Sequence, residues 1–256
     1  MDTSVIIICY NQEATVARAI ESVLSQDYGD MEVVVSDDCS TDGTRRIVAD
    51  YARRRLVRDV SPRRHLGIPA NYFHALSCCR GRYIADCAGD DAWTDPARLS
   101  RLRALMTPGV TVAIGSWMEG ARIVRPFPSP GIYPGRESLP GFIAHTRRLH
   151  LSAALYLRRA IDPVDTWVMR KSFGCEDMPI MCRLLSRGSI ACDGTTVLDY
   201  TVSGTSITRP ASRRRAAAYY SRSLLCTVAM GYRYGCLRSA LPYALRLAIH
   251  ILRTVI

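Results

Sequence analysis

Hydrophobic residues in the first half of the chain alternate between continuous runs and spaced positions. Residues 4–9, SVIIIC, form a run of the kind found in strands that are buried on both faces. The segment that follows has helical spacing, with four apolar residues on one face: Val16, Ile20, Val23 and Leu24. A buried strand followed by an amphipathic helix predicts one strand–helix unit of an α/β sheet.

The same alternation continues to residue 117. Further strands are predicted at 31–38, 82–88 and 110–117, and further helices at 40–55, 67–79 and 95–106. Strands that alternate with helices predict an α/β fold with a mostly parallel central sheet. Ligands of such sheets bind outside the carboxyl ends of the strands, so polar residues at those ends are the first candidates for a site.

The pattern is less regular after residue 117. Residues 126–141 contain five prolines and three glycines and are predicted to be a surface loop. Residues 152–161 return to strand-like character. Residues 175–188 predict a helix with acidic residues in its first turn and a stop at Gly188. Residues 189–208 predict short strands and turns.

Positive charge is concentrated at the C-terminal end of the chain. The 256 residues carry a formal net charge of +11, and after the last acidic residue, Asp199, there are nine arginines and no carboxylate. A nucleic-acid binder would more often spread its basic residues over one folded surface, so no nucleic-acid partner is expected. The charge pattern therefore predicts a separate basic segment at the C-terminus.

The ten cysteines form no C-x-x-C pair, and most lie in apolar runs, so reduced and buried thiols are expected rather than disulfides or a metal cluster. The N-terminus has no basic region before its short apolar run, which is not the pattern of a signal peptide. No apolar stretch reaches the length needed to span a bilayer. A cytoplasmic location is therefore expected.

Three pairs of acidic residues stand where a strand ends or a helix begins: Asp37–Asp38, Asp90–Asp91 and Glu176–Asp177. One such pair can be a turn or a helix N-cap. Adjacent carboxylates at the mouth of a buried strand are costly unless a positive group binds there. Three pairs in one α/β chain favour a site that combines a divalent cation with a general base.

The stretches 4–44, 89–99 (GDDAWTDPARL) and 173–188 (FGCEDMPIMCRLLSRG) resemble the inverting family 2 glycosyltransferases, which have the GT-A fold. The resemblance covers roughly residues 4–207 and implies a catalytic domain at 1–207 followed by a C-terminal extension at 208–256. The membrane spans and the Q-x-x-R-W motif of processive synthases are absent, which favours the transfer of a single sugar.

The resemblance implies roles on the donor side of the site. Cys9, Tyr10 and Asn11 are expected to line the nucleotide pocket, with Tyr10 against the base. Asp38 is expected to accept a hydrogen bond from a uracil-like base, and Asp90 to approach the ribose.

The resemblance also implies the catalytic roles. Asp91 is expected to hold a Mn²⁺ or Mg²⁺ ion that bridges the two phosphates of the donor. Asp177 is expected to be the general base that takes the proton of the acceptor hydroxyl, with inversion at the anomeric carbon. Glu176 is interpreted as an acid that orients the site, and Trp93 as either the floor of the acceptor site or a packing residue.

Other polar residues have simpler interpretations. Asp37 is either a ligand or a turn residue, and Asp42 is interpreted as a helix N-terminal residue. The five histidines show no metal-ligand spacing and are interpreted as structural or surface residues. A histidine that many relatives carry after the last strand is missing from YTVSGTSIT, so no histidine ligand to the metal is expected there.

The C-terminal extension has the pattern of a basic amphipathic helix at 238–256. One face carries Leu245, Ile249, Leu252 and Ile256, and another carries Arg246, His250 and Arg253. The segment is expected to lie on the inner face of the cell membrane, and the alternative is a helix packed on the catalytic domain or on a second subunit. A membrane location suits an acceptor carried on a polyprenyl diphosphate.

The sequence thus predicts a metal-dependent transferase that uses a nucleotide-sugar, expected to be UDP-linked, in the synthesis of a surface polysaccharide. A nucleotidyltransferase would usually have a glycine-rich loop with basic residues after the first strand. The segment in that place, CYNQEATV, contains neither a glycine nor a basic residue. The alternative function is a catalytically inactive adaptor that binds nucleotides or membranes with the same fold.

Overall fold

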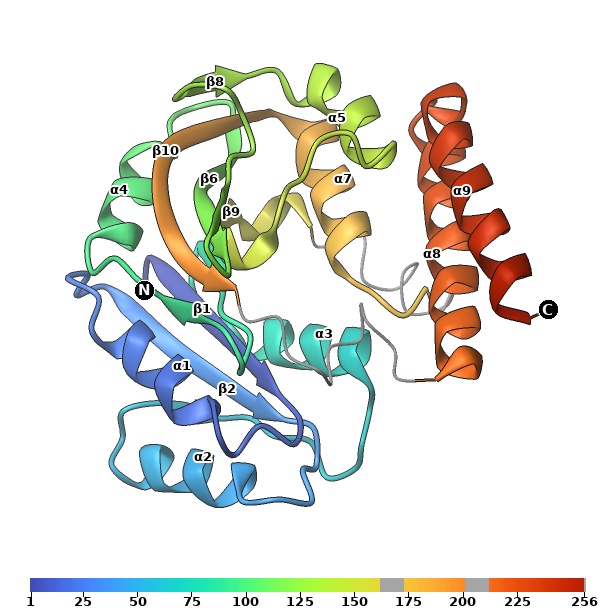
Figure 1. Cartoon of the computed structure of the whole chain (residues 1–256). Helices are drawn as coiled ribbons and strands as arrows, with labels where there is room; N and C mark the ends of the chain where they lie inside the picture. The colour runs from blue at the N-terminus through green and yellow to red at the C-terminus, as the bar shows by residue number, and fades with distance from the viewer. Residues whose placement is uncertain (162–172, 201–211, 256) are drawn as a thin grey trace.

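A computed structural model of the chain describes residues 1–161, 173–200 and 212–255. The strands form a ten-stranded sheet whose main path has the order β3-β2-β1-β4-β9-β6-β10-β5, with β7 and β8 attached to β6 and β10. Helices pack around this sheet, and two long helices at the C-terminus stand side by side at one edge of the molecule (Figure 1).

The first half of the chain builds the parallel part of the sheet. Its strands are β1 (Thr3–Cys9), β2 (Met31–Asp37), β3 (Arg58–Asp59) and β4 (Tyr83–Asp86), and its helices are α1 (Val16–Leu24), α2 (Thr44–Arg53) and α3 (Ile68–Cys78). β1 lies between β2 and β4 and is parallel to both. The run at 5–7 is at most 1% exposed, as expected of a strand covered on both faces.

The second half adds antiparallel strands. Its strands are β5 (Ala92–Trp93), β6 (Val110–Glu119), β7 (Arg122–Val124), β8 (Gly131–Tyr133), β9 (Ala154–Leu157) and β10 (Ser189–Tyr200). Its helices are α4 (Arg98–Ala104), α5 (Gly135–Ile143) and α7 (Asp177–Arg187), with short 3₁₀ turns η1 (Leu151–Ala153) and η2 (Arg158–Ala160). β9 is antiparallel to both β4 and β6, whereas the long β6–β10 pairing is parallel. The predicted α/β fold with a largely parallel sheet is confirmed.

The prediction of a loop at 126–141 was wrong, because this segment contains β8 and most of α5. Pro134 lies just before the helix, and Pro140 lies within it. The helix forms because Leu139, Phe142 and Ile143 are buried by tertiary packing. Gly135 has no room for a Cβ, since its backbone lies against the backbone oxygens of Leu185 and Gly188 at the end of α7.

The prediction of several short strands at 189–208 was also wrong for the described part, where β10 runs without a break from Ser189 to Tyr200. The turn signal in this segment is Gly194, which has a φ of +80° and lies where the register with β6 shifts between Cys192 and Thr196. A glycine in a left-handed conformation makes a bulge here rather than a turn.

The C-terminal helices α8 (Arg213–Arg233) and α9 (Leu237–Val255) form an antiparallel hairpin. Gly231 lets the two helices approach, because a Cβ there would lie 2.8 Å from the Cβ of Ala240. The hairpin packs on α5 and α7. The predicted boundary between residues 207 and 208 lies outside the described residues, as does Ile256.

The structure separates two faces of α9. Ala240, Ala244 and Leu247 are buried, whereas Leu245 and Leu252 are 63% and 60% exposed. Within the described ranges, no helix combines the length and apolarity needed to cross a bilayer.

Candidate active site

The loops that follow β1, β2 and β4 meet at one edge of the sheet. Cys9 at the end of β1 is in register with Asp37 at the end of β2, and Ile6 with Asp86 at the end of β4. The backbone amide of Gly89 donates to the carbonyl of Ile8 over 3.1 Å. Gly89 must be a glycine for this approach, because a Cβ there would lie 2.7 Å from the Cβ of Cys9. The carboxyl ends of three strands thus converge, as the sequence predicted.

Asn11 ties the first loop to the second. It has a left-handed backbone, with a φ of 53°, which asparagine tolerates better than most residues. Its side-chain oxygen accepts a hydrogen bond from the amide of Thr41 at 2.8 Å, and its own amide donates to Oγ of Ser40 at 2.8 Å. Asn11 therefore shapes the edge of the predicted nucleotide pocket through the backbone as well as through its side chain.

The side chain of Cys9 points into the interior. Its thiol is 4% exposed and lies 4.0 Å from a carboxylate oxygen of Asp37. Burial, followed by the nearby acidic residues, raises the pKa of this thiol far above its usual range. Only the backbone of Cys9 is therefore in a position to line the predicted pocket.

Tyr10, His65 and Asp38 form a cluster at the end of β2. The ring of Tyr10 is 45% exposed, and its centroid lies 4.7 Å from that of His65. The buried carboxylate of Asp38 accepts hydrogen bonds from the amides of Leu66 at 2.7 Å and Gly67 at 2.8 Å. Oδ1 of Asp38, which accepts from Leu66, has a second lone pair, so Asp38 can still accept a bond from a planar N–H group beside Tyr10.

His65 lies beside Asp38 with a side chain that is 55% exposed, which agrees with its interpretation as a surface residue. Its Nδ1 lies 3.1 Å from Oδ2 of Asp38 and 3.0 Å from the backbone oxygen of Asp38. The sequence gives no signal for this contact, because 27 residues separate the two positions.

Asp37 and Asp42 act as structural residues in the described chain. Asp37 is fully buried and accepts hydrogen bonds from the amide and the hydroxyl of Ser40. Asp42 accepts from the amide of Thr44 at 2.9 Å at the start of α2 and from the amide of Glu13 at 3.1 Å. The geometry agrees with the interpretation of Asp37 as a turn residue and of Asp42 as a helix N-terminal residue.

Asp90 and Asp91 follow β4 in the third loop. Asp91 is 1% exposed, and its amide donates to the carbonyl of Ala88 at 3.0 Å. Asp90 is half-buried, and burial raises the pKa of its carboxyl group, against a hydrogen bond from the Gln12 side chain that lowers it. The guanidinium of Arg18 donates to the backbone oxygen of Asp90 at 3.0 Å and so holds the loop against α1.

The residues present fit a divalent cation that arrives with a diphosphate. No group of three or more His, Cys, Asp or Glu side chains with metal-site geometry occurs among the described residues. Mg²⁺ is usually held by one or two carboxylates together with substrate phosphates rather than by an all-protein cage. The adjacent carboxylates of Asp90 and Asp91 at the converging loops supply a donor set of that kind.

Glu176 and Asp177 open α7 in different environments. Glu176 is 8% exposed, and its Oε2 has no hydrogen-bond partner among the described residues. Burial and then the charge of Asp177 raise the pKa of Glu176 well above its usual range. Asp177 is exposed in the first turn of the helix, where the helix dipole favours a negative charge. A base must be accessible and ionised, so the geometry favours Asp177 over Glu176 for that role.

Trp93 packs inside the protein. It is 5% exposed, pairs with Leu198 of β10, and stacks on the guanidinium of Arg98 at 3.8 Å from the ring centroid. Arg98 is itself fully buried and donates to the carbonyls of Ser152 and Ala154 at 2.8 and 3.1 Å. The geometry agrees with the packing interpretation of Trp93 and not with an acceptor floor.

A buried carboxyl group that the sequence analysis did not single out lies beneath the site. Asp86 accepts a hydrogen bond from the hydroxyl of Tyr156 at 2.6 Å and a longer one, of 3.3 Å, from Tyr72. Burial raises its pKa to about 7, and the charge of Asp177 adds to this, against the Tyr156 hydrogen bond that lowers it. Asp177 and the end of β4 are therefore close enough to interact electrostatically.

The pKa of Asp86 predicts a pH-dependent stability. Because its folded-state pKa, about 7, exceeds its ordinary value of 3.8, the folded protein keeps a proton that the unfolded chain loses between these values. The stabilisation is complete below pH 4 and is lost as the pH rises through 7. The wild type should lose up to about 4 kcal/mol of its free energy of unfolding between pH 4 and pH 8 through this group. Asp86→Asn lacks the titrating carboxyl group, so the difference in free energy of unfolding, variant minus wild type, should rise by that amount over the same range. Urea unfolding at both pH values tests this, and equal differences would contradict it.

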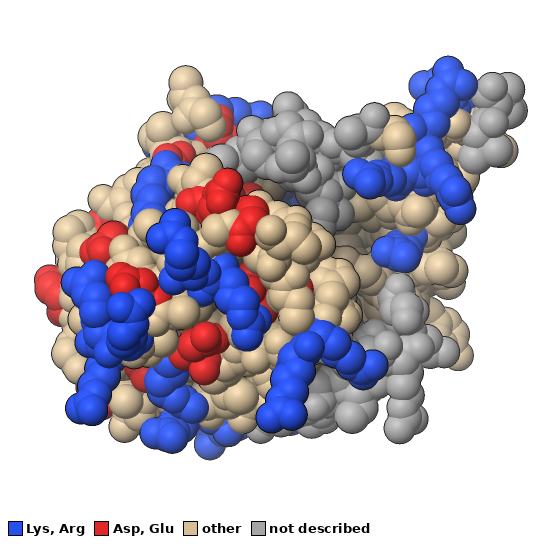
Figure 2. Space-filling model, turned by 90° about the horizontal axis from the view of Figure 1, so that it is seen from below, with Lys and Arg blue, Asp and Glu red and all other residues tan. Residues whose placement is uncertain are grey.

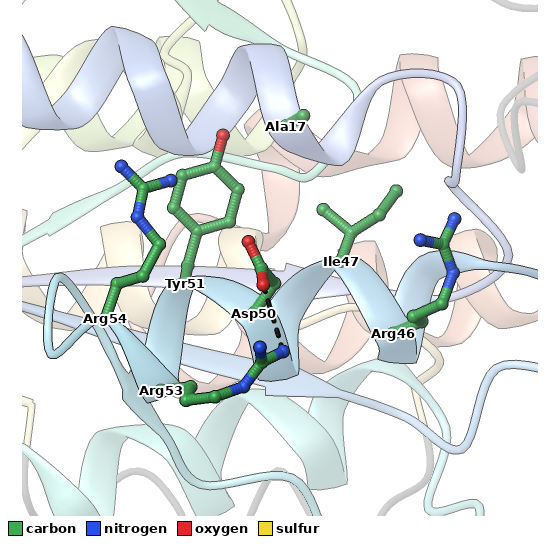
Figure 3. Close-up of a pocket in the computed structure, with 7 residues that line it drawn as sticks. All are labelled: Ala17, Arg46, Ile47, Asp50, Tyr51, Arg53 and Arg54. Carbon is green, nitrogen blue, oxygen red and sulfur yellow. Dashed lines mark hydrogen bonds and ion pairs between the residues drawn. The ribbon is translucent and has the colours of Figure 1, made fainter.

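The hollow in Figure 3 lies elsewhere, on the outer surface between α1 and α2. It is lined by Ala17 of α1, by five residues of α2 and by Arg54 just after this helix, and Arg53 and Asp50 form an ion pair of 2.9 Å. None of the predicted site residues lines it. The candidate site is therefore defined by the converging loops and not by this hollow.

Known proteins share the sequence pattern of the chain. The family profile described as "Glycosyl transferase family 2" matches residues 4–172, which ends before Glu176 and Asp177. EpsE of Bacillus subtilis, named as a glycosyltransferase, is 38% identical over 143 residues, which are 50% of this chain and 50% of EpsE. The Escherichia coli protein named UDP-Glc:alpha-D-GlcNAc-diphosphoundecaprenol beta-1,3-glucosyltransferase WfaP is 36% identical over 90 residues, 35% of this chain and 36% of WfaP. The chain spans no more than half the length of either relative.

Solved structures share the fold. The crystal structure of S. aureus TarS 1–349 in complex with UDP-GlcNAc has a TM-score of 0.72 and 20% identity, over 94% of this chain and 72% of that one. The mannosyltransferase PcManGT from Pyrobaculum calidifontis, in complex with GDP-Man and Mn²⁺, has a TM-score of 0.65 and 18% identity, over 98% of this chain and 74% of that one. The predicted GT-A fold is confirmed.

Proposed function

The chain belongs to glycosyl transferase family 2, and from this premise we propose that it transfers one sugar from a nucleotide-diphospho-sugar to a hydroxyl group of an acceptor, with inversion. The observation that carries the proposal is the convergence of Asp38, Asp91 and Asp177. The first two lie on loops joined at the carboxyl edge of the sheet, and the third interacts electrostatically with Asp86 at that edge.

The chain's own residues account for donor binding and for proton transfer. In this proposal Asp38 accepts a hydrogen bond from the base, Tyr10 covers the base, and Asp90 approaches the ribose. A divalent cation held by Asp91 would supply Lewis-acid stabilisation of the departing diphosphate. Asp177 removes the proton of the acceptor hydroxyl as that oxygen attacks the anomeric carbon and the bond from this carbon to the diphosphate oxygen breaks.

The donor is proposed to be UDP-linked. TarS was solved with UDP-GlcNAc and PcManGT with GDP-Man, so the fold accommodates both nucleotides. Calorimetric titration with UDP, GDP and dTDP, each with and without Mn²⁺, tests the proposal. Metal-dependent binding of UDP alone supports a UDP-sugar donor, and binding of GDP or dTDP instead reassigns the donor. A chain that binds no nucleotide in either condition would contradict the proposed activity.

The acceptor is proposed to be a lipid-linked glycan of surface-polysaccharide synthesis, reached from the inner face of the membrane. WfaP, by its name, acts on a diphosphoundecaprenol-linked sugar. Five large hydrophobic residues among the described part of the hairpin are more than half exposed: Leu225, Tyr232, Leu241, Leu245 and Leu252. Arginines gather on the hairpin with no acidic side chain among its described residues, whereas both charges mix on the rest of the visible face (Figure 2). Exposed apolar residues beside uncompensated cations suit an anionic membrane surface.

Replacement of Leu245 and Leu252 by glutamate should weaken binding to vesicles that contain anionic lipid by about tenfold or more, since each leucine contributes apolar burial. Co-sedimentation with such vesicles measures the change. Ile132→Glu is the matched control, because Ile132 is 58% exposed on β8, away from the hairpin. Unchanged vesicle binding, or a hairpin that instead mediates dimerisation in ultracentrifugation, would contradict the membrane assignment.

A further inference from the structure

Arg222 of α8 lies across the loop that leads to Asp177. Gly174 in this loop has a left-handed backbone, with a φ of +76°. A Cβ at Gly174 would lie 2.9 Å from Cδ and 3.4 Å from Nη1 of Arg222. The absence of a side chain at Gly174 therefore allows the arginine to rest on the backbone three residues before the predicted base.

Packing between α8 and α7 fixes this position. Cys226 is 1% exposed, and its Sγ lies 3.7 Å from Sδ of Met178, the residue after Asp177. Positions 222 and 226 are one helical turn apart and lie on the same face of α8. Burial of Cys226 against α7 thus holds Arg222 beside the catalytic loop.

The charge of Arg222 is available to an external anion. Its side chain is exposed, and it takes part in none of the ion pairs found among the described residues. No carboxylate follows Asp199 in the sequence, so α8 and α9 supply no acid to neutralise it. An arginine in this setting matches phosphate oxygens well, because its planar guanidinium donates two parallel hydrogen bonds.

We propose that Arg222 binds the diphosphate of the acceptor lipid, an inference that rests on the proposed function. Three residues of chain span at most about 11 Å, so the phosphate bound at Arg222 lies close to the hydroxyl served by Asp177. That separation suits a sugar attached directly to the diphosphate and not the far end of a long glycan. The exposed residues Leu225 and Tyr232 continue along α8 from Arg222 and give the lipid chain an apolar path.

Two synthetic acceptors test this assignment. One is GlcNAc α-linked to decyl diphosphate, and the other is the decyl glycoside of GlcNAc without phosphate. For Arg222→Gln, KM for the first acceptor should rise by about 10- to 100-fold, the loss expected for hydrogen bonds to a charged group. Arg222→Lys should recover part of this loss, because it keeps the charge without the bidentate geometry. KM for the donor and turnover of the phosphate-free acceptor should stay unchanged.

The control is Arg238→Gln, which removes an exposed arginine from the hairpin at the start of α9. An equal rise in KM for the diphosphate acceptor in this control would overturn the assignment. The effect would then come from a general attraction between the acceptor's phosphates and the basic hairpin. A rise in KM for the donor in Arg222→Gln would also overturn it, because the arginine would then serve the nucleotide diphosphate. Equal losses with both acceptors would overturn it as well.

Binding without turnover separates this inference from the proposed function. Decyl diphosphate alone should bind the wild-type chain about tenfold or more tightly than Arg222→Gln in calorimetry. If this difference is found in a chain that transfers no sugar, the Arg222 site stands and the transferase proposal fails. Equal binding to both chains would overturn the Arg222 site, whatever the activity.

Discussion

Asp177→Asn is expected to lower kcat by about a hundredfold to ten-thousandfold, the usual contribution of a general base. Asparagine keeps the size of the side chain and its place in the first turn of α7, but it cannot take a proton from the acceptor hydroxyl. Donor binding should be almost unchanged, because Asp177 lies outside the three converging loops that form the nucleotide side of the site. Steady-state transfer assays give kcat, and nucleotide titration gives donor affinity.

Glu176→Gln is the matched control for this experiment. Glu176 is buried and its pKa is raised well above the usual range, so a glutamine keeps the size of the side chain and removes only a charge that burial disfavours. The control should keep activity within about tenfold of wild type, as expected for a residue that does not exchange the proton. A large loss in Glu176→Gln with an active Asp177→Asn would assign the base to Glu176. Full transfer activity in both variants would mean that neither residue is the base, whereas a wild-type chain that transfers no sugar would favour the inactive adaptor.

Asp91→Asn is expected to remove metal-dependent nucleotide binding. The substitution keeps the shape of a side chain that is 1% exposed but removes the charge that would hold the cation. Affinity for the nucleotide in Mn²⁺ should fall by about a hundredfold or more, and turnover by about a thousandfold, since metal stabilisation of the leaving group is worth several kcal/mol. Calorimetry with and without Mn²⁺ measures the first effect, and transfer assays measure the second.

Asp42→Asn controls for general damage to the acidic loops. Asp42 accepts a hydrogen bond from the amide of Thr44 at the start of α2, and asparagine keeps an oxygen that can accept it, so the replacement should change the free energy of unfolding by less than about 1 kcal/mol and leave the Mn²⁺ dependence in place. If Asp91→Asn binds nucleotide in Mn²⁺ as tightly as wild type does, Asp91 is not the metal ligand. The acid pair would then have a structural role only.

The sequence predicted the parallel half of the fold with good accuracy. β1 and β2 are short, continuous apolar runs, and α1 and α2 have apolar residues at helical spacing. Burial of such patterns follows from their own periodicity, whatever their neighbours are. The position of the acidic pairs at strand ends could also be predicted from the local sequence. Parallel strands bring their carboxyl ends to one edge of the sheet, so these pairs were expected at the same edge.

The second half of the fold was decided by tertiary contacts. The proline-rich segment becomes α5 because it packs on α7, and Gly194 marks a bulge because β6 continues beside it. Local sequence signals at both places favour a turn or a loop. Burial of apolar side chains from distant segments outweighs those local preferences, and no local pattern reports on it.

The candidate site divides in the same way. The sequence by itself determined which carboxylates stand at strand and helix ends, because that depends only on the order of residues along each element. Only the tertiary structure decided that Asp38 meets His65, that Asp86 is buried under two tyrosines, and that Trp93 stacks on Arg98 inside the protein. It also placed Arg222 on Gly174, 48 positions earlier in the chain. Such contacts join residues far apart in sequence, and their burial and charge follow from how whole elements pack.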